Sequence, residues 1–166
     1  MTTNLQLEEY CKEINIKLNG IYNKDNLPYL AKRKNGFYIV NSQDEYNLEG
    51  EMNGGIHWVC FVVEGKECCY MDSFGGEPYR QIQEFAPSKV VYSKEQIQDI
   101  KSSRCGEFCV WFGYCCLKKY KKVKGLHNRL MLFLNDFDKE NLKENDNIIK
   151  ENFSSRSEEH TSELQS

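Results

Sequence analysis

Cys105 has the residue type and the setting of a nucleophile. Gly106 follows it, and the apolar segment 108–117 then indicates a buried helix. At the N-terminus of such a helix the macrodipole favours a thiolate. The stretch 97–116 contains four of the eight cysteines. These cysteines could therefore include a nucleophile, serve as metal ligands, or be small apolar packing groups.

A histidine and an aspartate could support this nucleophile. Two apolar runs joined by Glu64-Gly65-Lys66 indicate a β-hairpin. His57 lies on its first strand and Asp72 ends the second, so the two side chains can meet across the ladder. A carboxylate there would hold the imidazole in one tautomer and stabilise its charged form. Beside that imidazolium, Cys105 would be nucleophilic at neutral pH.

Gln98 is the fourth candidate, seven residues before Cys105. The loop between them can fold the Gln98 amide back over the thiol, as a second oxyanion donor beside the Cys105 N–H. Each residue alone has an ordinary explanation: a strand histidine, a turn-capping aspartate, a loop glutamine and a packing cysteine. Together, in the order His, Asp, Gln, Cys, they indicate nucleophilic catalysis.

Size and composition limit the setting in which this chemistry would occur. At 166 residues and 40% hydrophobic, the chain is long enough for one domain. It has no apolar run near the about 20 residues of a membrane span, and its first residues lack a signal-peptide core. We expect a protein that is not secreted, with reduced cysteines. The formal charge of -3 gives no global attraction to nucleic acid.

The pattern along the chain predicts an α+β fold. Apolar residues at helical spacing run from residue 4 to about residue 20. Strands are expected at 36–41 and 89–93 beside the hairpin, and one or two amphipathic helices over 129–153. The strands would form a central mixed sheet packed on the buried helix that carries the nucleophile.

The last eleven residues, 156–166, stand apart from the rest. Their sequence, RSEEHTSELQS, resembles the translation of a common sequencing-library adapter. We therefore expect residues 1–155 to form the domain and residues 156–166 to be a tail outside the fold. A disordered polar tail is the alternative, because this composition would also produce one.

The remaining cysteines favour packing over metal binding. They lack two C-x2-C pairs at zinc-finger spacing, so we expect no metal site. Cys60 and one residue of each adjacent pair should face the core, with the others more exposed. The adjacent pairs are Cys68-Cys69 and Cys115-Cys116.

A run of lysines follows the helix that carries Cys105. One explanation is that these lysines form the solvated end of the helix, where positive charges interact favourably with the helix dipole. As a patch beside an aromatic residue, they could contact DNA phosphates without sequence specificity. The candidate nucleic-acid residues are Lys118, Lys119, Lys121 and Lys122.

Several motifs together resemble a known family. GGIHWV, YMDSFG and IQDIKSSRCGEFC are similar to the signature of the adenain-like cysteine proteases of adenoviruses and Polinton/Maverick elements. SUMO-deconjugating proteases are more distant relatives. The similarity extends upstream through LNGIYNKDNLPY and GFYIVNSQDEYN, so it covers residues 4–153. Ser102, three residues before Cys105, fits the pattern, whereas Asp72 stands where adenain has Glu and the SUMO proteases have Asp.

The resemblance implies a papain-like cysteine protease fold of the adenain and SUMO-protease type. Trp58 would cover a narrow substrate channel, and Gly106 would let backbone approach closely. The implied activity is that of a cysteine endopeptidase of a virus or virus-like mobile element, which cleaves capsid or core precursors at Gly-Gly or Gly-X-Gly sites. The implied catalytic residues are His57, Asp72, Gln98 (in the oxyanion hole) and Cys105.

The resemblance also bears on partners. We expect a monomer that acts on viral precursor polyproteins in the host cytoplasm or nucleus and in the virion, without a membrane. No cofactor is required, although DNA or a viral peptide could activate the enzyme. The alternatives are a deconjugating protease for a ubiquitin-like modifier, an acyltransferase that uses acetyl-CoA, and a catalytically inactive binding module.

Overall fold

The computed structural model describes residues 2–27, 34–42 and 57–165. Five strands form one sheet in the order β1-β2-β3-β4-β5. The β1–β2 and β4–β5 pairs are parallel, whereas β3 is antiparallel to both of its neighbours. The sheet is therefore mixed, and the predicted α+β class is confirmed. The strands are β1 (Gly20–Asn23), β2 (Gly36–Asn41), β3 (Trp58–Glu64), β4 (Glu67–Met71) and β5 (Val90–Val91).

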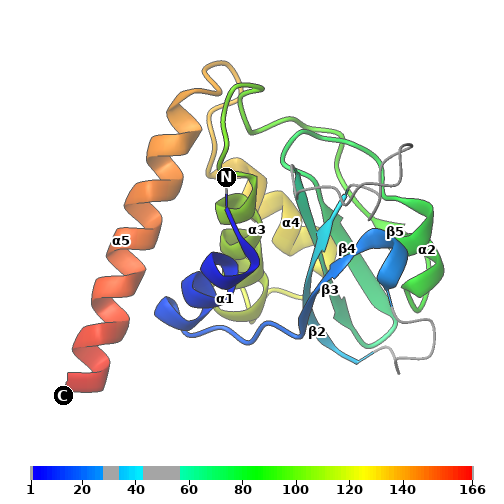
Figure 1. Cartoon of the computed structure of the whole chain (residues 1–166), viewed down its shortest axis with the longest axis horizontal. Helices are drawn as coiled ribbons and strands as arrows, with labels where there is room; N and C mark the ends of the chain where they lie inside the picture. Colours follow the sequence, from blue (N-terminus) through cyan, green and yellow to red (C-terminus); the bar gives the residue numbers. More distant parts are fainter. Residues whose placement is uncertain (1, 28–33, 43–56, 166) are drawn as a thin grey trace.

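Helices cover both faces of this sheet (Figure 1). Four of them, α1, α3, α4 and α5, share one apolar core with one face, and α2 packs on the other face. None of the helices in the described ranges is long and apolar enough to cross a membrane. The helical elements are α1 (Asn4–Glu13), a 3-10 turn η1 (Lys24–Asn26), α2 (Arg80–Phe85), α3 (Cys105–Tyr114), a π-helical turn η2 (Cys115–Lys119), α4 (Leu126–Asn135) and α5 (Glu144–Gln165).

α3 is the central helix of the larger core. Nine of its ten residues are buried, because the sheet lies on one side and α1 and α5 lie on the other (Figure 1). Burying one aromatic side chain such as Phe108 contributes about 1.5–3 kcal/mol. Gly113 lets the helix approach β2, since a Cβ there would lie 2.6 Å from the Phe37 ring. The packing of α3 therefore fixes the position of Cys105, the first residue of the helix.

Most of the predicted elements are confirmed, with differences in length. The N-terminal helix ends at Glu13 because Asn15 adopts a left-handed φ of 56°. Strand β2 and the β3–β4 hairpin have the predicted positions. The strand expected at 89–93 is reduced to β5, and β1 and α2 were not predicted.

The prediction that some of the paired cysteines are exposed is wrong. All eight cysteines are buried, because both faces of the sheet are covered. Cys68 packs in the core beneath α2, and its neighbour Cys69 packs in the core beneath α3. In the second pair, Cys115 and Cys116 both belong to the α3 core.

The C-terminal residues continue α5 as a helix through Gln165. Ile149 is the last residue of α5 that is buried. Beyond it, Phe153 touches the rings of Tyr10 and Trp111, at centroid separations of 5.7 and 5.8 Å. The Arg156 guanidinium lies 5.0 Å from the centroid of the Tyr114 ring. The domain boundary at residue 155 stays a prediction.

Deleting residues 156–166 should leave the melting temperature nearly unchanged. None of the residues 156–164 is buried, so the deletion removes little apolar contact. By contrast, Ile149→Ala in the same helix should cost about 2–5 kcal/mol, and each kcal/mol lowers Tm by about 2–4 °C. Thermal unfolding of the two variants beside the full chain makes the comparison. A loss on deletion as large as that of Ile149→Ala would show that the tail is part of the fold.

Candidate active site

The open end of the β3–β4 hairpin brings His57 and Asp72 together. His57 directly precedes β3, and Asp72 directly follows β4. The strands pair Cys60 with Met71, so Asp72 lies opposite Val59, and His57, two residues before Val59, is a diagonal neighbour of Asp72 on the same face. The His57 Nε2 atom lies 2.7 Å from Asp72 Oδ1. The predicted histidine–aspartate contact is therefore present in the structure.

Backbone groups of the following turn hold the Asp72 carboxylate. Its Oδ1 atom accepts the Phe74 N–H at 2.9 Å, and its Oδ2 atom accepts the Gly76 N–H at 3.2 Å. Only glycine allows the second approach, because a Cβ on Gly76 would lie 2.6 Å from Oδ2. The Phe74 ring lies against the imidazole of His57, with a centroid separation of 4.7 Å. The turn thus fixes both the carboxylate and the imidazole plane.

The environment of His57 favours its protonated form. Burial lowers the pKa of His57, but the contacts of its side chain with Asp72 and Cys105 and the negative charges of these two groups raise it to about 9. The other ring nitrogen, Nδ1, is buried and has no partner within hydrogen-bond distance among the described residues, so the contact with Cys105 is longer than a hydrogen bond. The site therefore favours an imidazolium at neutral pH, with one N–H that Asp72 does not use.

Cys105 begins α3 and contacts β3. The Cys105 Sγ atom is 3.5 Å from the Trp58 backbone N–H, which donates to it. One helical turn later, the Cys109 thiol donates to the Trp58 carbonyl at 3.4 Å. The N–H and the carbonyl of Trp58 can both bond sulfur, because β4 ends at Met71 and so does not extend far enough to pair with Trp58. Cys105 is only 6% exposed, so the packing of α3 against β3 places its thiol at the hairpin's open end.

The start of α3 could stabilise negative charge. Its N-cap is Arg104, whose side chain makes no capping hydrogen bond. The first N–H groups of a helix have no intrahelical partner. Together with the helix dipole, they favour an anion beside the first turn.

The other seven cysteines are buried thiols whose protonated form is favoured. Burial raises the pKa of each of these thiols, to about 12 for Cys11 and Cys68. The rest of this set are Cys60, Cys69, Cys109, Cys115 and Cys116. They are neutral packing groups at physiological pH. Among the described residues, no group of three or more His, Cys, Asp or Glu side chains could hold a metal ion.

The N-terminal segment covers the two residues predicted to bind substrate. The Trp58 indole is 4% exposed, and its Nε1–H donates to the Thr2 carbonyl at 3.0 Å. A Cβ on Gly106 would lie 2.7 Å from Leu7 and 3.2 Å from Thr2. Residues 2–7 therefore occupy the space beside Gly106 that a side chain at this position would fill. The substrate roles of Trp58 and Gly106 stay predictions.

Gln98 occupies a different setting from the one that its spacing suggested. The side chain is fully buried, and its Oε1 atom accepts the Ser73 hydroxyl at 2.5 Å. Its Nε2 atom donates to the carbonyl and the hydroxyl of Ser102, at 3.0 and 3.2 Å. The structure thus joins Gln98 to Ser73 and Ser102, and its predicted role as an oxyanion donor stays untested.

The lysine run lies on η2 and the turn after it. All four lysines of the predicted set are exposed. Lys119 lies 3.4 Å from Asp136, and burial and that carboxylate act on its pKa in opposite directions, with a net increase. The set thus consists of four exposed cations, of which Lys119 also pairs with a carboxylate of the molecule.

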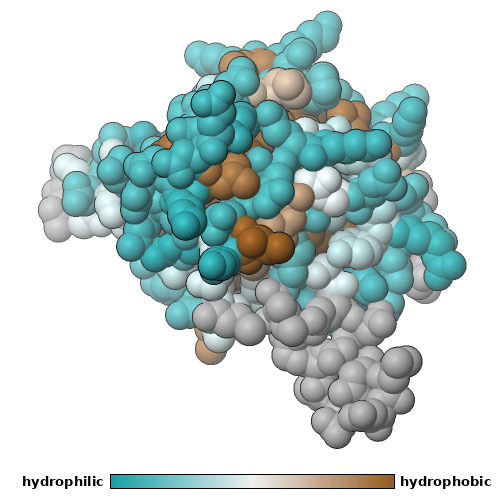
Figure 2. Space-filling view, turned by 90° about the horizontal axis from the view of Figure 1, so that it is seen from above, coloured by the Kyte–Doolittle hydropathy of each residue, from teal (hydrophilic) through white to brown (hydrophobic). Residues whose placement is uncertain are grey.

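The face of the molecule that Figure 2 shows is mixed in character. Figure 2 views the molecule from above, from the end where the N-terminus lies beside α3 in Figure 1. Hydrophobic residues reach the surface near the middle of this face, among hydrophilic ones. Two large apolar side chains, Leu5 in α1 and Ile100 in the loop before α3, are 76% and 80% exposed.

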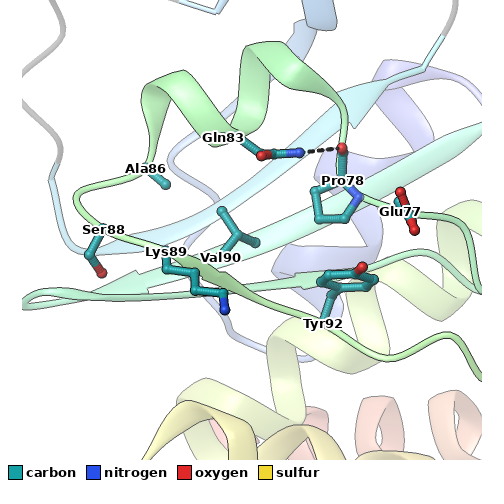
Figure 3. A pocket seen from close by; sticks show the side chains of 8 residues that line it. All are labelled: Glu77, Pro78, Gln83, Ala86, Ser88, Lys89, Val90 and Tyr92. Atoms are coloured by element: carbon teal, nitrogen blue, oxygen red, sulfur yellow. Dashed lines mark hydrogen bonds between the residues drawn. The ribbon is translucent and has the colours of Figure 1, made fainter.

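A separate cavity of about 410 Å³ lies between α2, β5 and the chain that leads into α2 (Figure 3). Pro78, Val90 and Tyr92 line it, and the Gln83 amide donates to the Pro78 carbonyl at its rim. None of the four predicted catalytic residues lines this cavity. Its position beside α2 sets it apart from the site around Cys105.

Sequence reasoning missed several residues that build the site. Phe74 and Ser73 follow Asp72 in the motif DSFGG, where turn chemistry was the available signal. Asp146, which accepts the Ser102 hydroxyl at 2.8 Å, had no signal because its partner is 44 residues away. The site therefore includes more hydrogen-bonded polar side chains than the motif suggested.

Comparison of the chain with protein-family models gave no match, and comparison with curated proteins gave none either. The chemistry of the site therefore has to be argued from its geometry. Parts of the motifs that resemble adenain, residues 28–29, 43–47 and 54–56, lie outside the described residues.

Iodoacetamide at pH 7 should modify the folded protein once, at Cys105. The other seven thiols are buried and their pKa values are raised, whereas Cys105 lies beside a protonated imidazole. His57→Ala should move the pH at which Cys105 reacts upward, because the neighbouring cation that favours the thiolate is lost. Mass spectrometry of the labelled protein across pH measures both effects. The exposed His127 gives the control, since His127→Ala should not shift the profile. Early modification at several cysteines, or no shift in His57→Ala, would contradict the assignment.

Proposed function

We propose that the protein is a cysteine endopeptidase with the papain-like fold of adenain and the SUMO proteases. The observation that carries the proposal is the arrangement of the His57 ring. Its Nε2 atom is bonded to Asp72 at 2.7 Å, while Nδ1 is buried and unpartnered among the described residues. A mixed sheet packed on the buried helix that begins at Cys105 supports the fold.

In the proposed reaction, the Cys105 thiolate attacks the carbonyl carbon of the scissile peptide bond. The carbonyl oxygen becomes an oxyanion, to which the Cys105 backbone N–H at the start of α3 donates. The His57 imidazolium gives its Nδ1 proton to the leaving amine, so the C–N bond breaks and a thioester remains. Asp72 keeps the other ring nitrogen protonated and orients the ring.

Water then completes the proposed cycle. The neutral His57 takes a proton from water through Nδ1, and the resulting hydroxide attacks the thioester carbonyl. The carboxylic acid product leaves, and Cys105 returns to the thiolate beside the imidazolium. Gln98 is the proposed second oxyanion donor, and its Nε2 atom bonds Ser102 in this structure.

The proposed substrates are capsid or core precursors of a virus or virus-like element, cut at Gly-Gly or Gly-X-Gly sites. The resemblance of the motifs supports this assignment, and glycine can thread a narrow slot where a Cβ would clash. The proposed setting is the host cytoplasm or nucleus and the virion, with the enzyme as a monomer. A deconjugating protease for a ubiquitin-like modifier is the second candidate, because Asp72 matches the SUMO proteases.

Peptide cleavage tests the proposal directly. Fluorogenic peptides with Gly-Gly should be cleaved, and matched peptides with Ala-Ala should not. Cys105→Ser should lower kcat/KM by at least about 10³-fold, whereas Cys11→Ser, a change at another buried thiol, should retain activity. Fusions to ubiquitin-like modifiers, assayed beside the linear peptides, separate the two candidates. If Cys105→Ser cleaves as fast as the natural sequence, the proposal fails.

DNA should stimulate cleavage if the lysine run contacts phosphates. The effect should fade as salt rises, because each neutralised phosphate adds about 0.9 to the slope of log K against log[salt]. The fourfold change Lys118, Lys119, Lys121 and Lys122→Gln should abolish the stimulation. A control with the same charge change elsewhere should keep it: Lys12, Lys17, Lys143 and Lys150→Gln. Rates measured with and without duplex DNA at two salt concentrations decide the matter. If both variants lose the stimulation by DNA equally, the stimulation depends on the overall charge of the protein and not on the lysine run.

A further inference from the structure

Thr2 contacts both residues that are predicted to bind substrate. Its carbonyl oxygen accepts the indole N–H of Trp58 at 3.0 Å, and a Cβ on Gly106 would lie 3.2 Å from its side-chain carbons. Thr2 is the first residue that the structure describes, yet only 9% of it is exposed, and this end of the chain lies beside α3 (Figure 1). One residue thus covers the Trp58 indole N–H and the backbone next to the nucleophile.

The helix that follows Thr2 is held by other interactions. Thr3 caps α1: its side chain accepts the Gln6 N–H at 3.2 Å, and the Gln6 side chain accepts the Thr3 N–H at 2.8 Å. Leu7 is fully buried and packs against α3, because a Cβ on Gly106 would lie 2.7 Å from it. Neither the cap nor this packing involves Thr2. The residue before the cap can therefore leave Trp58 while α1 stays folded and docked.

The indole N–H of Trp58 needs another acceptor whenever Thr2 leaves. A buried donor without a partner is unfavourable, and indole N–H groups usually have a partner when they are buried. The backbone N–H of the same residue donates to the Cys105 Sγ atom at 3.5 Å, so Trp58 is adjacent to the nucleophile. A peptide that reaches Cys105 brings backbone carbonyl oxygens, and the acceptor that Thr2 offers is of the same kind.

We propose that residues 2–3, called the N-terminal strap below, are an autoinhibitory segment in which Thr2 imitates the main chain of a peptide substrate. The inference rests on the proposed function and adds a binding contact to it. When the strap is released, Trp58 donates its indole N–H to a peptide carbonyl of the substrate. Gly106 matters in both states, because a side chain there would obstruct the strap and the peptide alike. The strap and the substrate thus compete for one surface.

Competition between the strap and the substrate has a kinetic signature. Saturating substrate displaces a competing segment, so removal of the strap should lower KM and leave kcat unchanged. A strap that merely supports Trp58 would give a different result, because its loss would loosen the residue beside the nucleophile and lower kcat. One hydrogen bond and one packed side chain hold the strap, so the fall in KM should be roughly 3- to 30-fold.

The experiment measures kcat and KM for Gly-Gly peptides in a small set of variants. Deletion of Thr2 and Thr3 should lower KM with kcat unchanged, and Asn4 is then available as a new cap for α1. Thr2→Gly, which removes the side chain that packs on Gly106, should act in the same direction more weakly. Leu5→Ala is the control, since Leu5 is 76% exposed and its loss should change neither constant. Melting temperatures verify that each variant is folded.

Trp58→Phe tests the role assigned to the indole N–H, because it keeps an aromatic ring and removes the donor. In the natural sequence this change releases the strap and also weakens substrate binding, so the two effects on KM partly cancel. In the deletion variant only the second effect remains, and Trp58→Phe should therefore raise KM more than it does in the natural sequence. An equal effect in both backgrounds would show that the strap and the substrate do not share Trp58.

A lower kcat or an unchanged KM in the deletion variant would overturn autoinhibition, and Thr2→Gly carries the same test if the deletion variant does not fold. Failure of the proposed function would appear separately, as absence of peptide cleavage by both the natural sequence and the deletion variant. Labelling of Cys105 would then still test the strap. The deletion should raise the rate of labelling by a bulky maleimide, relative to that by iodoacetamide, by at least about 3-fold. An unchanged ratio would show that the strap does not cover the site.

Discussion

The contact between His57 and Asp72 depends on the register of one hairpin. β3 and β4 pair Cys60 with Met71, so Asp72 lies opposite Val59. His57, two residues before Val59, is a diagonal neighbour of Asp72 on the same face, and the two side chains meet at 2.7 Å. A shift of one residue would turn each strand's side chains to the other face. Both faces are packed, with Cys69 on one and Cys68 on the other, so such a shift would disrupt two cores. Burial of the hairpin thus enforces the geometry of the site.

The third member of the site comes from a helix, and its placement depends on core packing. α3 is buried on nearly all sides, and Gly113 allows it to lie against the Phe37 ring. At its start, the Trp58 backbone contacts both Cys105 and Cys109. Since Trp58 follows His57 directly, the same strand holds the imidazole and touches the nucleophile. The site is therefore built where β3 extends past its partner β4.

Much of this arrangement could be predicted from the sequence, and the failures have physical causes. The apolar runs of β3 and β4 and the helix that follows Cys105 have strong patterns, so the hairpin and α3 were predictable. β1 has four half-buried residues and α2 has six residues. Both elements are too short for a hydrophobic period to be recognised in the sequence. The exposure of paired cysteines was mispredicted because a strand with both faces covered loses its alternation. Ser73 lies 25 residues before its partner Gln98, and Asp146 lies 44 residues after its partner Ser102, so the spacing of Gln98 from Cys105 suggested a role but could not reveal either residue.

One unsatisfied atom links the structure to chemistry. Buried polar atoms nearly always have partners, and an exception has to be explained by strain, by function or by an unseen ligand. Four side-chain atoms of the described residues are such exceptions, namely His57 Nδ1, Tyr70 OH, Trp111 Nε1 and Arg156 Nε, and of these His57 Nδ1 belongs to the site. The rest of the site is well bonded: Asp72 accepts two backbone N–H groups besides the imidazole. Stability alone would favour a partner for Nδ1 or an apolar side chain in place of His57. An imidazole fixed on one side and left open on the other has the properties that a proton-transfer group needs, because only the open nitrogen can give its proton to a leaving amine.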